Sequence, residues 1–337
     1  MPQNKRYIYV NAFEGLPKLT DFELITEDVP SLQSNEVLCE ALYFSVDPYM
    51  RAHSNWMTEG QTMIGTQVAK IVESAHDKFP VGSLLFGDFG WQLYTVCNPG
   101  VTHSCFDRRS PQLLSDLNHF PASLSLGVLG MPGNLAYCGL LEVCKPETGE
   151  VVVVSGAGGA IGSIVGQIAK IKGCKVVGIV GSEEKMAWIQ DELGFDAAIN
   201  YKTSNVAEAL QEAVPEGVDC YFDNVGGETS SAVIAQMNMH GRVACCGAIA
   251  IYNEDGNLPS KVTPIQLPII AKELKIEGIT GRRFAKRADE SFKVLTKWLV
   301  EGKLHYKETV YGGFEKLPEA LISILKGENL GKAIVRA

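Results

Sequence analysis

The sequence lacks the features that would place it in a membrane or in a secreted class. No stretch reaches the 18 or so consecutive apolar residues that a membrane-spanning helix needs. The first ten residues, MPQNKRYIYV, contain no apolar core, so we expect no secretory signal. The nine cysteines show no Cys-x-x-Cys spacing, and no Asn-x-Ser/Thr sequon occurs. These absences favour a reduced, cytoplasmic protein over a disulfide framework.

An excess of positive charge is also missing. The chain has 30 lysines and arginines against 39 aspartates and glutamates, a net charge of −9. Nucleic acids and anionic membrane surfaces are negative too, so we expect neither as a partner. The hydrophobic content of 46% is ordinary for a globular protein, and 337 residues predict two domains rather than one core.

The most informative segment that is present is residues 151–172, VVVVSGAGGAIGSIVGQIAKIK. It opens with a β-branched run, Val151 to Val154, as a parallel strand buried on both faces does. Three glycines follow at a spacing of three: Gly156, Gly159 and Gly162. Apolar residues at helical spacing come next: Ile161, Val165, Ile168 and Ile171. A strand, a glycine turn and a helix in that order predict a dinucleotide-binding βαβ unit, whose helix N-terminus favours phosphate. Taken alone, such glycines can also serve merely to turn a chain.

The pattern along the chain changes near residue 150. From residue 5 to about 125 it shows short β-like runs separated by Gly, Pro and Asn. From about residue 150, strands and helices alternate, which is typical of a doubly wound α/β domain. The expected strands are Val151–Ser155, Lys175–Val180, Cys220–Asp223, Arg242–Gly247 and Lys275–Thr280. The expected helices are Ala160–Lys172, Glu183–Glu192, Val206–Val214 and a segment within Glu228–Met239. After residue 290 we expect a helix, a strand, a helix and a closing strand that returns to the first domain.

Several motifs together resemble a known family. They are Val46-Asp47-Pro48-Tyr49-Met50-Arg51, Gly130-Met131-Pro132-Gly133, Ala136-Tyr137-Cys138-Gly139-Leu140, the glycine turn, Cys220-Tyr221-Phe222-Asp223-Asn224-Val225-Gly226-Gly227, Cys246-Gly247-Ala248-Ile249 with Tyr252-Asn253, and Glu328-Asn329-Leu330-Gly331-Lys332. In this order they resemble the medium-chain dehydrogenase/reductase superfamily. Within it they are similar to the zinc-free branch of prostaglandin reductases, leukotriene B4 12-hydroxydehydrogenases and alkenal double-bond reductases.

The resemblance implies an α/β fold with two domains. A GroES-like β-barrel domain would comprise residues 1–122 and 303–337, and a Rossmann domain with a doubly wound parallel sheet would comprise residues 123–302. It also implies a homodimer.

The same resemblance allows a test for metal. Zinc-dependent relatives hold catalytic zinc through a Cys, a His and a second Cys, which would fall near Val46 or Asp47, at Thr66 and near Met131. None of these is a thiol or an imidazole, and a catalytic zinc needs about three protein ligands. The six histidines form no i, i+4 pair either: 53, 76, 103, 119, 240 and 305. We therefore expect no metal. Without a Lewis acid, reduction of an activated C=C bond is favoured, since the conjugated carbonyl already makes the β-carbon electrophilic.

The segment after the second strand indicates the cofactor. NAD enzymes usually carry an acidic residue about twenty positions beyond the glycine turn, whereas here the strand tip reads Val180-Gly181-Ser182. Ser182 and Lys185 are suited to a 2′-phosphate, and Tyr201 matches a further family contact to it. We therefore predict NADPH. The alternative is that Lys185 pairs with a neighbouring glutamate and that Glu183 binds NAD.

Two tyrosines are the catalytic candidates. Hydride transfer to the β-carbon leaves an enolate, which needs a hydrogen-bond donor and then a proton at the α-carbon, and a phenol can supply both. Tyr252 lies beyond a parallel strand and matches the family's tyrosine beside the nicotinamide ribose. Tyr49 is the second candidate, to orient the substrate carbonyl, and an anchoring role in its loop is the alternative. Arg51 would either attract a lipid carboxylate or pair with Asp47.

Further cofactor contacts follow from the resemblance. They are the turn residues Gly156, Ala157, Gly158, Gly159, Ala160 and Gly162, the amides of Asn224 and Asn329, the segment Cys246, Gly247, Ala248 and Ile249, and the strand end Ile279, Thr280 and Gly281. The loop 257–272 contains no tyrosine, whereas mammalian-type members carry one there near the substrate tail, so a pocket for shorter enals is expected.

The function that the sequence predicts is NADPH-dependent reduction of α,β-unsaturated aldehydes and ketones, of the 15-oxo-prostaglandin 13-reductase or 2-alkenal reductase type. Dehydrogenation of leukotriene B4 is a further implication of the branch. Quinone reduction is a rival, although that branch lacks the Val46–Arg51 motif. A non-catalytic NADPH-binding protein is a rival of another class.

Overall fold

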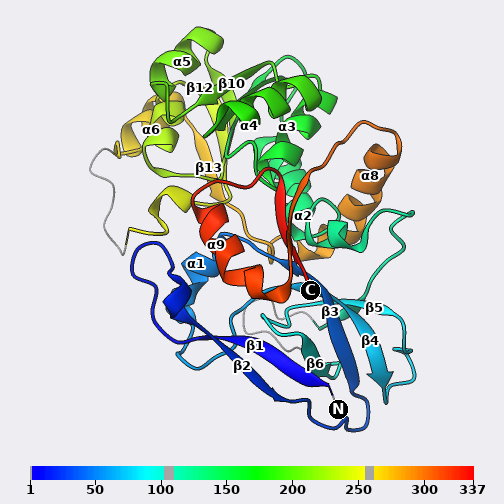
Figure 1. Ribbon diagram of the computed structural model, residues 1–337. Helices are drawn as coiled ribbons and strands as arrows, with labels where there is room; N and C mark the ends of the chain where they lie inside the picture. The colour runs from blue at the N-terminus through cyan, green and yellow to red at the C-terminus, as the bar shows by residue number, and fades with distance from the viewer. Residues whose placement is uncertain (1, 102–109, 255–261) are drawn as a thin grey trace. The chain divides into compact units, whose positions relative to one another are not determined.

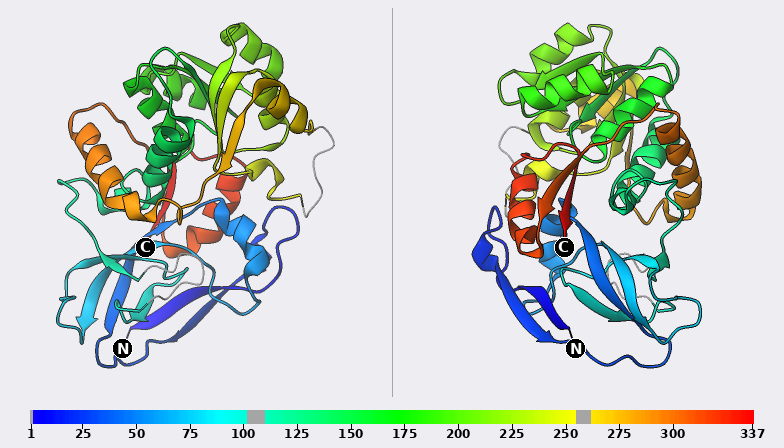
Figure 2. Two further views of the ribbon diagram at one scale, coloured as in Figure 1. Left: turned by 180° about the vertical axis from the view of Figure 1, so that it is seen from behind. Right: turned by 45° about the vertical axis from the view of Figure 1, so that its right-hand side comes forward.

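The computed structural model describes residues 2–101, 110–254 and 262–337. These residues form two compact units (Figure 1 and Figure 2). The first comprises the described residues up to Gly127 with Glu308–Asn329 and Ala333–Ala337, and the second comprises Val128–Lys307 and Leu330–Lys332. The domain boundaries expected from the sequence stay predictions.

The second unit is built on a six-stranded, wholly parallel sheet in the order β10-β9-β8-β11-β12-β13. The strands are β8 (Val151–Ser155), β9 (Lys175–Val180), β10 (Ala197–Asn200), β11 (Val218–Asp223), β12 (Met237–Cys245) and β13 (Lys275–Gly278). Counted along the chain this is the order 3-2-1-4-5-6 of the doubly wound dinucleotide-binding fold. The predicted α/β class is confirmed.

The second unit also contains helices, several of which pack on the sheet and bury β8 along its whole length. They are α2 (Met131–Cys138), α3 (Gly162–Ile171), α4 (Glu183–Ala187), α5 (Val206–Ala213), α6 (Gly227–Ala235), α7 (Gln266–Lys272) and α8 (Ala288–Val300). Val151 and Val153 of β8 share a core with Leu210 of α5 and Val233 of α6. Helix α3 packs on β8 and β9, with α2 beside it. All five residues of β8 are buried, as the β-branched run predicts.

Several elements differ from the sequence expectation, and three of them illustrate why. Strand β10 was not expected, because four residues with a single β-branched side chain, Ile199, carry little strand signal. Part of the loop expected over 257–272 is helix α7, and residues 257–261 lie outside the described residues. Strand β12 begins at Met237, inside the segment expected to be helical, because the chain returns to pair with β11 there.

The first unit contains antiparallel sheets. Seven strands follow the order β14-β15-β3-β4-β5-β7, with β6 paired to β3, and β1 pairs with β2 separately. The strands are β1 (Gln3–Tyr9), β2 (Phe22–Asp28), β3 (Val37–Ser45), β4 (Gln67–Ser74), β5 (Leu84–Gly87), β6 (Tyr94–Cys97), β7 (Gln112–Leu113), β14 (Glu308–Gly312) and β15 (Lys332–Arg336). Two helices accompany them, α1 (Tyr49–His53) and α9 (Leu317–Leu325). Trp91 and Phe44 are fully buried in the core against α9, which shows that the C-terminal segment folds back onto the N-terminal strands.

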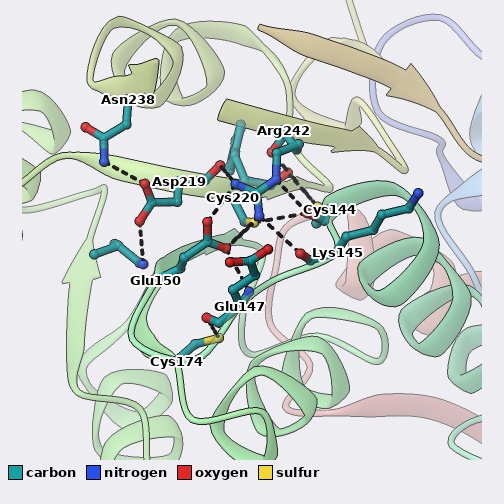
Figure 3. A network of polar contacts seen from close by, with 11 residues as sticks. Cys144, Lys145, Glu147, Glu150, Cys174, Asp219, Cys220, Asn238 and Arg242 are labelled. Atoms are coloured by element: carbon teal, nitrogen blue, oxygen red, sulfur yellow. Dashed lines mark hydrogen bonds and ion pairs between the residues drawn. The ribbon is translucent and has the colours of Figure 1, made fainter. Parts of the chain in front are cut away.

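A polar network ties together the amino ends of the parallel strands (Figure 3). The guanidinium of Arg242 binds both carboxylate oxygens of Glu150, at 2.9 and 2.6 Å, and donates to the carbonyl of Cys144 at 2.8 Å. Next to it, Asp219 accepts hydrogen bonds from the Asn238 amide and the Val151 N–H. The network therefore joins β8, β11 and β12 at the end of the sheet opposite the glycine turn.

Candidate functional site

The glycine turn joins β8 to α3 as predicted, and two of its glycines are required by geometry. Gly156 has φ +63°, in the left-handed region that other residues rarely adopt. A Cβ on Gly162 would overlap the carbonyl oxygen of Gly156 and lie 2.8 Å from the Cα of Ala157. The turn can therefore close tightly and bring backbone N–H groups and the start of α3 to a pyrophosphate.

A second segment pairs with this turn. Gly331 donates its N–H to the carbonyl of Gly158 at 2.9 Å, and Gly159 and Gly331 form a parallel bridge. A Cβ on Gly331 would overlap the carbonyl of Lys307. The sequence signal for this contact was the Glu328–Lys332 motif, but its pairing with the turn was not foreseen. Asn329 precedes this segment, and its contact to the cofactor stays a prediction.

The end of β11 is held by the buried carboxylate of Asp223, which the sequence analysis did not single out. Its Oδ1 accepts four hydrogen bonds of 2.8–3.0 Å, from the Ser155 and Tyr221 hydroxyls and from the N–H groups of Val225 and Gly226. Asn224 donates its amide to the Ser155 carbonyl at 2.8 Å. The Nδ2 of Asn224 therefore fastens β11 to β8, and a contact to the cofactor is left to its Oδ1.

Tyr252 lies against the turn that follows β12. Its hydroxyl oxygen accepts the N–H of Ala248 at 3.2 Å. A Cβ on Gly247 would be 3.4 Å from that hydroxyl and 2.9 Å from the carbonyl of Asn224, so the phenol points to the carboxyl ends of β11 and β12. Burial raises the pKa of Tyr252, and the Ala248 N–H offsets this only in part. The phenol is therefore neutral near pH 7 and keeps its proton to donate.

The thiol of Cys246 is part of the same turn. Burial raises the pKa of Cys246 to about 12, with the negative charge of Asp223 as a smaller cause. The backbone N–H of Cys246 donates to the carbonyl of Asp223 at 2.8 Å. This residue is thus a protonated thiol on a fixed backbone, and its contact to the cofactor stays a prediction.

Four residues at the ends of β9 and β10 form what we call the basic cluster: Ser182, Lys185, Tyr201 and Lys202. The aliphatic chain of Lys185 lies over the glycine turn, with its Cδ 3.0 Å from the Cβ position of Gly158. The Lys202 ammonium lies 6.0 Å from the centroid of the Tyr201 ring. Burial lowers the pKa of Lys185, and the nearby charge of Lys202 lowers it further. Two cations therefore meet beside the turn, which suits a phosphate dianion.

Lys202 was missed in the sequence, although the Asn200-Tyr201-Lys202 segment offered its signal. The alternative acid, Glu183, has its Oε1 bound by the Nδ2 of Asn200 at 2.7 Å. Ser182 caps α4, because its hydroxyl accepts the N–H of Lys185 at 3.3 Å. These contacts favour the 2′-phosphate over a free ribose hydroxyl at this position.

The segment Ile279–Gly281 directly follows strand β13. Ile279 is 4% exposed and lies beside Gly139, while its N–H donates to the carbonyl of Cys245 at 2.9 Å. Strand β13 ends at Gly278, two residues before the expected end. Thr280 is exposed, and Gly281 lies beside Met131.

In the first unit, Tyr49 begins α1 and is half-buried. Its ring centroid is 5.4 Å from that of His53, which stacks on Trp56 at 4.8 Å. Arg51 is only 2% exposed, and its guanidinium donates to the carbonyls of Gly15 and Phe13 at 3.1 and 3.4 Å. A buried guanidinium engaged in this way is not placed to attract a lipid carboxylate. Burial thus disfavours attraction of a lipid carboxylate by Arg51, and both this alternative and the pairing with Asp47 stay predictions.

The positions at which zinc-dependent relatives carry their ligands are occupied here by residues that take part in other hydrogen bonds. The Thr66 hydroxyl donates to Asp88 at 2.7 Å, and the Ser45 hydroxyl donates to Asp47. Across residues 2–101, 110–254 and 262–337, no three His, Cys, Asp or Glu side chains are grouped so as to hold a metal ion. In the same residues, no helix is long and apolar enough to cross a membrane.

Two family models match the chain. One, described as the N-terminal domain of oxidoreductase, matches residues 5–104, and the other, described as zinc-binding dehydrogenase, matches residues 160–301. Thr66 and Met131, which stand at two of the zinc-ligand positions of relatives, are neither thiols nor imidazoles.

Similar proteins extend over the whole chain. Prostaglandin reductase 1 of Bos taurus is 48% identical, with 100% of both chains covered. The NADP(+)-dependent 2-alkenal reductase of Nicotiana tabacum is 37% identical, with 98% of this chain and 97% of the relative covered. Among solved structures, CurA from Vibrio vulnificus in complex with NADPH superposes with a TM-score of 0.90 at 34% identity, with 99% of each chain covered.

Proposed function

We propose that this chain, which belongs to the prostaglandin reductase and alkenal reductase branch of the medium-chain dehydrogenase/reductase superfamily, reduces the C=C bond of α,β-unsaturated aldehydes and ketones with NADPH. The observation that carries the proposal is the Tyr252 hydroxyl, whose oxygen is held by a backbone N–H at the carboxyl ends of the parallel strands. Ligands bind at this edge in doubly wound sheets.

The residues present fit the dinucleotide. The turn from Gly156 to Gly162 is tight enough for backbone N–H groups to approach a pyrophosphate. The basic cluster supplies Lys185 and Lys202 for the 2′-phosphate, and a hydrogen bond to a charged group contributes about 1.5–3 kcal/mol. The rest of the cofactor is proposed to contact the Oδ1 of Asn224, the Cys246–Ile249 turn, the Ile279–Gly281 backbone and Asn329.

In the proposed mechanism these residues would hold NADPH, which would supply the hydride for the β-carbon of the enone. Tyr252 donates a hydrogen bond to the carbonyl oxygen as negative charge develops there, which stabilises the enolate. The α-carbon then takes a proton, for which we propose the neutral phenol of Tyr252 as the donor, and solvent returns a proton to the resulting phenolate. Tyr49 is proposed to orient the substrate carbonyl.

The buried state of Arg51 bears on the substrate. Since its guanidinium is used by the carbonyls of Gly15 and Phe13, the carboxylate of a long lipid gains nothing from it. We therefore propose that neutral enals and enones are reduced with higher kcat/KM than carboxylate-bearing 15-oxo-prostaglandins.

Two finer proposals concern the setting of the protein. Its relatives act on small molecules, and we propose a homodimer located in the cytoplasm. Size-exclusion chromatography with light scattering tests the first, and fractionation of the source cells tests the second.

The deciding experiment is an NADPH-oxidation assay against 4-hydroxynonenal, a 15-oxo-prostaglandin, a 1-alken-3-one and a quinone. Saturated carbonyl products identified by mass spectrometry would support the proposal. Turnover confined to the quinone would replace it by quinone reduction. NADPH binding with no turnover on any of the four would replace it by a non-catalytic role.

A further inference from the structure

A side chain next to Tyr252 carries an acceptor that the protein leaves unused. Asn253 follows the short helical turn Ile249–Ile251 and is half-buried. Its Oδ1 is shielded from solvent and has no hydrogen-bond partner among residues 2–101, 110–254 and 262–337. Elsewhere in the same unit the amides of Asn200, Asn224 and Asn238 all donate to protein oxygens. A buried acceptor without a donor destabilises the fold, so its presence calls for an explanation.

We propose that Asn253 is a cofactor-binding residue whose Oδ1 accepts a hydrogen bond from the nicotinamide half of the bound dinucleotide. This inference rests on the proposed function. The donor would be the N–H₂ of the carboxamide or a hydroxyl of the adjoining ribose.

The chemistry of the two ligands selects the cofactor over the substrate. The enone unit of the proposed substrates offers a carbonyl oxygen and carbon-bound hydrogens, and so has no N–H or O–H to give to an acceptor. The nicotinamide half of the cofactor carries both kinds of donor. An acceptor at Asn253 is therefore complementary to the cofactor.

The strand order selects the nicotinamide half over the adenosine half. The basic cluster, which suits the 2′-phosphate of the adenosine half, lies at the ends of β9 and β10, on one side of β8. Asn253 follows β12, which lies on the other side of β8 beyond β11. A dinucleotide that crosses the glycine turn at the end of β8 thus brings its nicotinamide half toward β11 and β12.

The arrangement gives neighbouring residues opposite roles. The Tyr252 hydroxyl keeps a proton to donate, because its oxygen accepts the Ala248 N–H, whereas Asn253 presents an acceptor. Asn253 would hold the cofactor while Tyr252 serves the substrate oxygen. Loss of the acceptor should then weaken cofactor binding more than it slows the bound complex.

The test compares Asn253→Leu, Asn253→Ala and Asn253→Asp with the unmodified protein. The dissociation constants of NADPH and of 2′,5′-ADP, which lacks the nicotinamide half, are measured by fluorescence titration and calorimetry, together with the ligand-free Tm. Asn238→Leu is the matched control, because it removes an amide that donates to Asp219 at 2.7 Å, at the far end of the sheet.

We expect Asn253→Leu and Asn253→Ala to raise the Kd of NADPH about three- to tenfold and to leave the Kd of 2′,5′-ADP within about twofold. Asn253→Asp keeps an acceptor and should lose less affinity than Asn253→Leu. The ligand-free Tm should not fall in Asn253→Leu, since no protein hydrogen bond is broken. Asn238→Leu should lower the Tm and leave both dissociation constants unchanged.

Two results overturn the inference while the unmodified protein still binds and oxidises NADPH. If both Asn253→Leu and Asn253→Ala leave the NADPH Kd within twofold, a water serves the acceptor and the inference is wrong. If the substitutions raise the Kd of 2′,5′-ADP as much as that of NADPH, Asn253 has a structural role and does not bind the nicotinamide half. An unmodified protein that fails to bind NADPH overturns the proposed function itself and this inference with it.

Discussion

The hydroxyl oxygen of Tyr252 accepts the backbone N–H of Ala248 at 3.2 Å. Because this contact occupies the oxygen, the phenolic proton is directed to a different acceptor. Burial raises the pKa of Tyr252 above its ordinary value of 10.0, so the proton is retained across the neutral range. A donor is present below the pKa and is lost as the pH rises through it. The titration of Tyr252 should therefore leave the rate of hydride transfer constant from about pH 6 to 9.

Replacing Tyr252 by Phe should slow hydride transfer about a hundredfold. Loss of one donor to a developing oxyanion costs on the order of 3 kcal/mol, while the ring's packing is kept. The measurement is single-turnover oxidation of NADPH by a simple enone, with the NADPH Kd determined in parallel and expected to change little. Tyr137→Phe is the matched control, since it removes a hydroxyl that contacts Glu290 at 3.3 Å. A Tyr252→Phe rate within a factor of two of the unmodified rate would show that the phenol is structural.

Lys185→Ala should raise the KM for NADPH about ten- to hundredfold and leave the KM for NADH nearly unchanged. The reason is the loss of a charge-assisted hydrogen bond of about 1.5–3 kcal/mol to the 2′-phosphate. Lys202→Ala should act in the same direction, and Lys172→Ala at the exposed end of α3 is the control. Steady-state kinetics with both cofactors provide the measurement. A preference of the unmodified protein for NADH would transfer the role to Glu183.

The pH dependence of NADPH binding should report the same residue. Burial lowers the pKa of Lys185, with Lys202 as the second cause, so its charge is lost at lower pH than that of an ordinary lysine. A lysine is cationic below its pKa, and the affinity for NADPH should fall as the pH rises through that value. Titrations from pH 7 to 10 with NADPH and NADH measure this, and the fall should be absent for NADH. Equal pH profiles for the two cofactors would contradict the assignment.

Removing metal ions should leave turnover unchanged. The positions that carry zinc ligands in other branches hold Thr66 and Met131, and catalytic zinc needs about three protein ligands. Dialysis against EDTA or 1,10-phenanthroline, with elemental analysis of the purified protein, is the measurement. Stoichiometric zinc combined with loss of activity on chelation would reverse this expectation.

Glu150→Gln should destabilise the second unit by about 2 kcal/mol, because it removes the charge that Arg242 binds in the polar network of Figure 3. The kinetics should not change, since Glu150 precedes β8 and the glycine turn follows it. Burial by itself would raise the pKa of Glu150, but the hydrogen bonds from Arg242 and the Glu147 N–H lower it below its ordinary value of 4.5. This stabilisation is present above that value and is lost as the pH falls through the lowered pKa. Urea unfolding at pH 7 and below pH 4.5 measures it, with exposed Glu212→Gln as control. An equal cost at both pH values would contradict the role of the charge.

The local signals in the sequence were sufficient for the class of the second unit. The β-branched run Val151–Val154, glycines at a spacing of three and helical periodicity act within one segment, and each is set by backbone sterics and burial. Strands β8 and β9 accordingly have the expected bounds. The absence of zinc ligands and the candidacy of Tyr252 also follow from residue identity together with the family motifs.

What only the tertiary structure decided depends on contacts between distant segments. The parallel order of β10 beside β9, the pairing of Gly331 with Gly158, and the hydrogen bond from the Ser155 hydroxyl to Asp223 join residues far apart in the chain. Whether Arg51 is free for a ligand and whether Asn253 has a partner are likewise decided by burial, which is a property of the packed fold. A linear pattern states what a side chain is able to donate or accept, and the fold determines which neighbour takes it up.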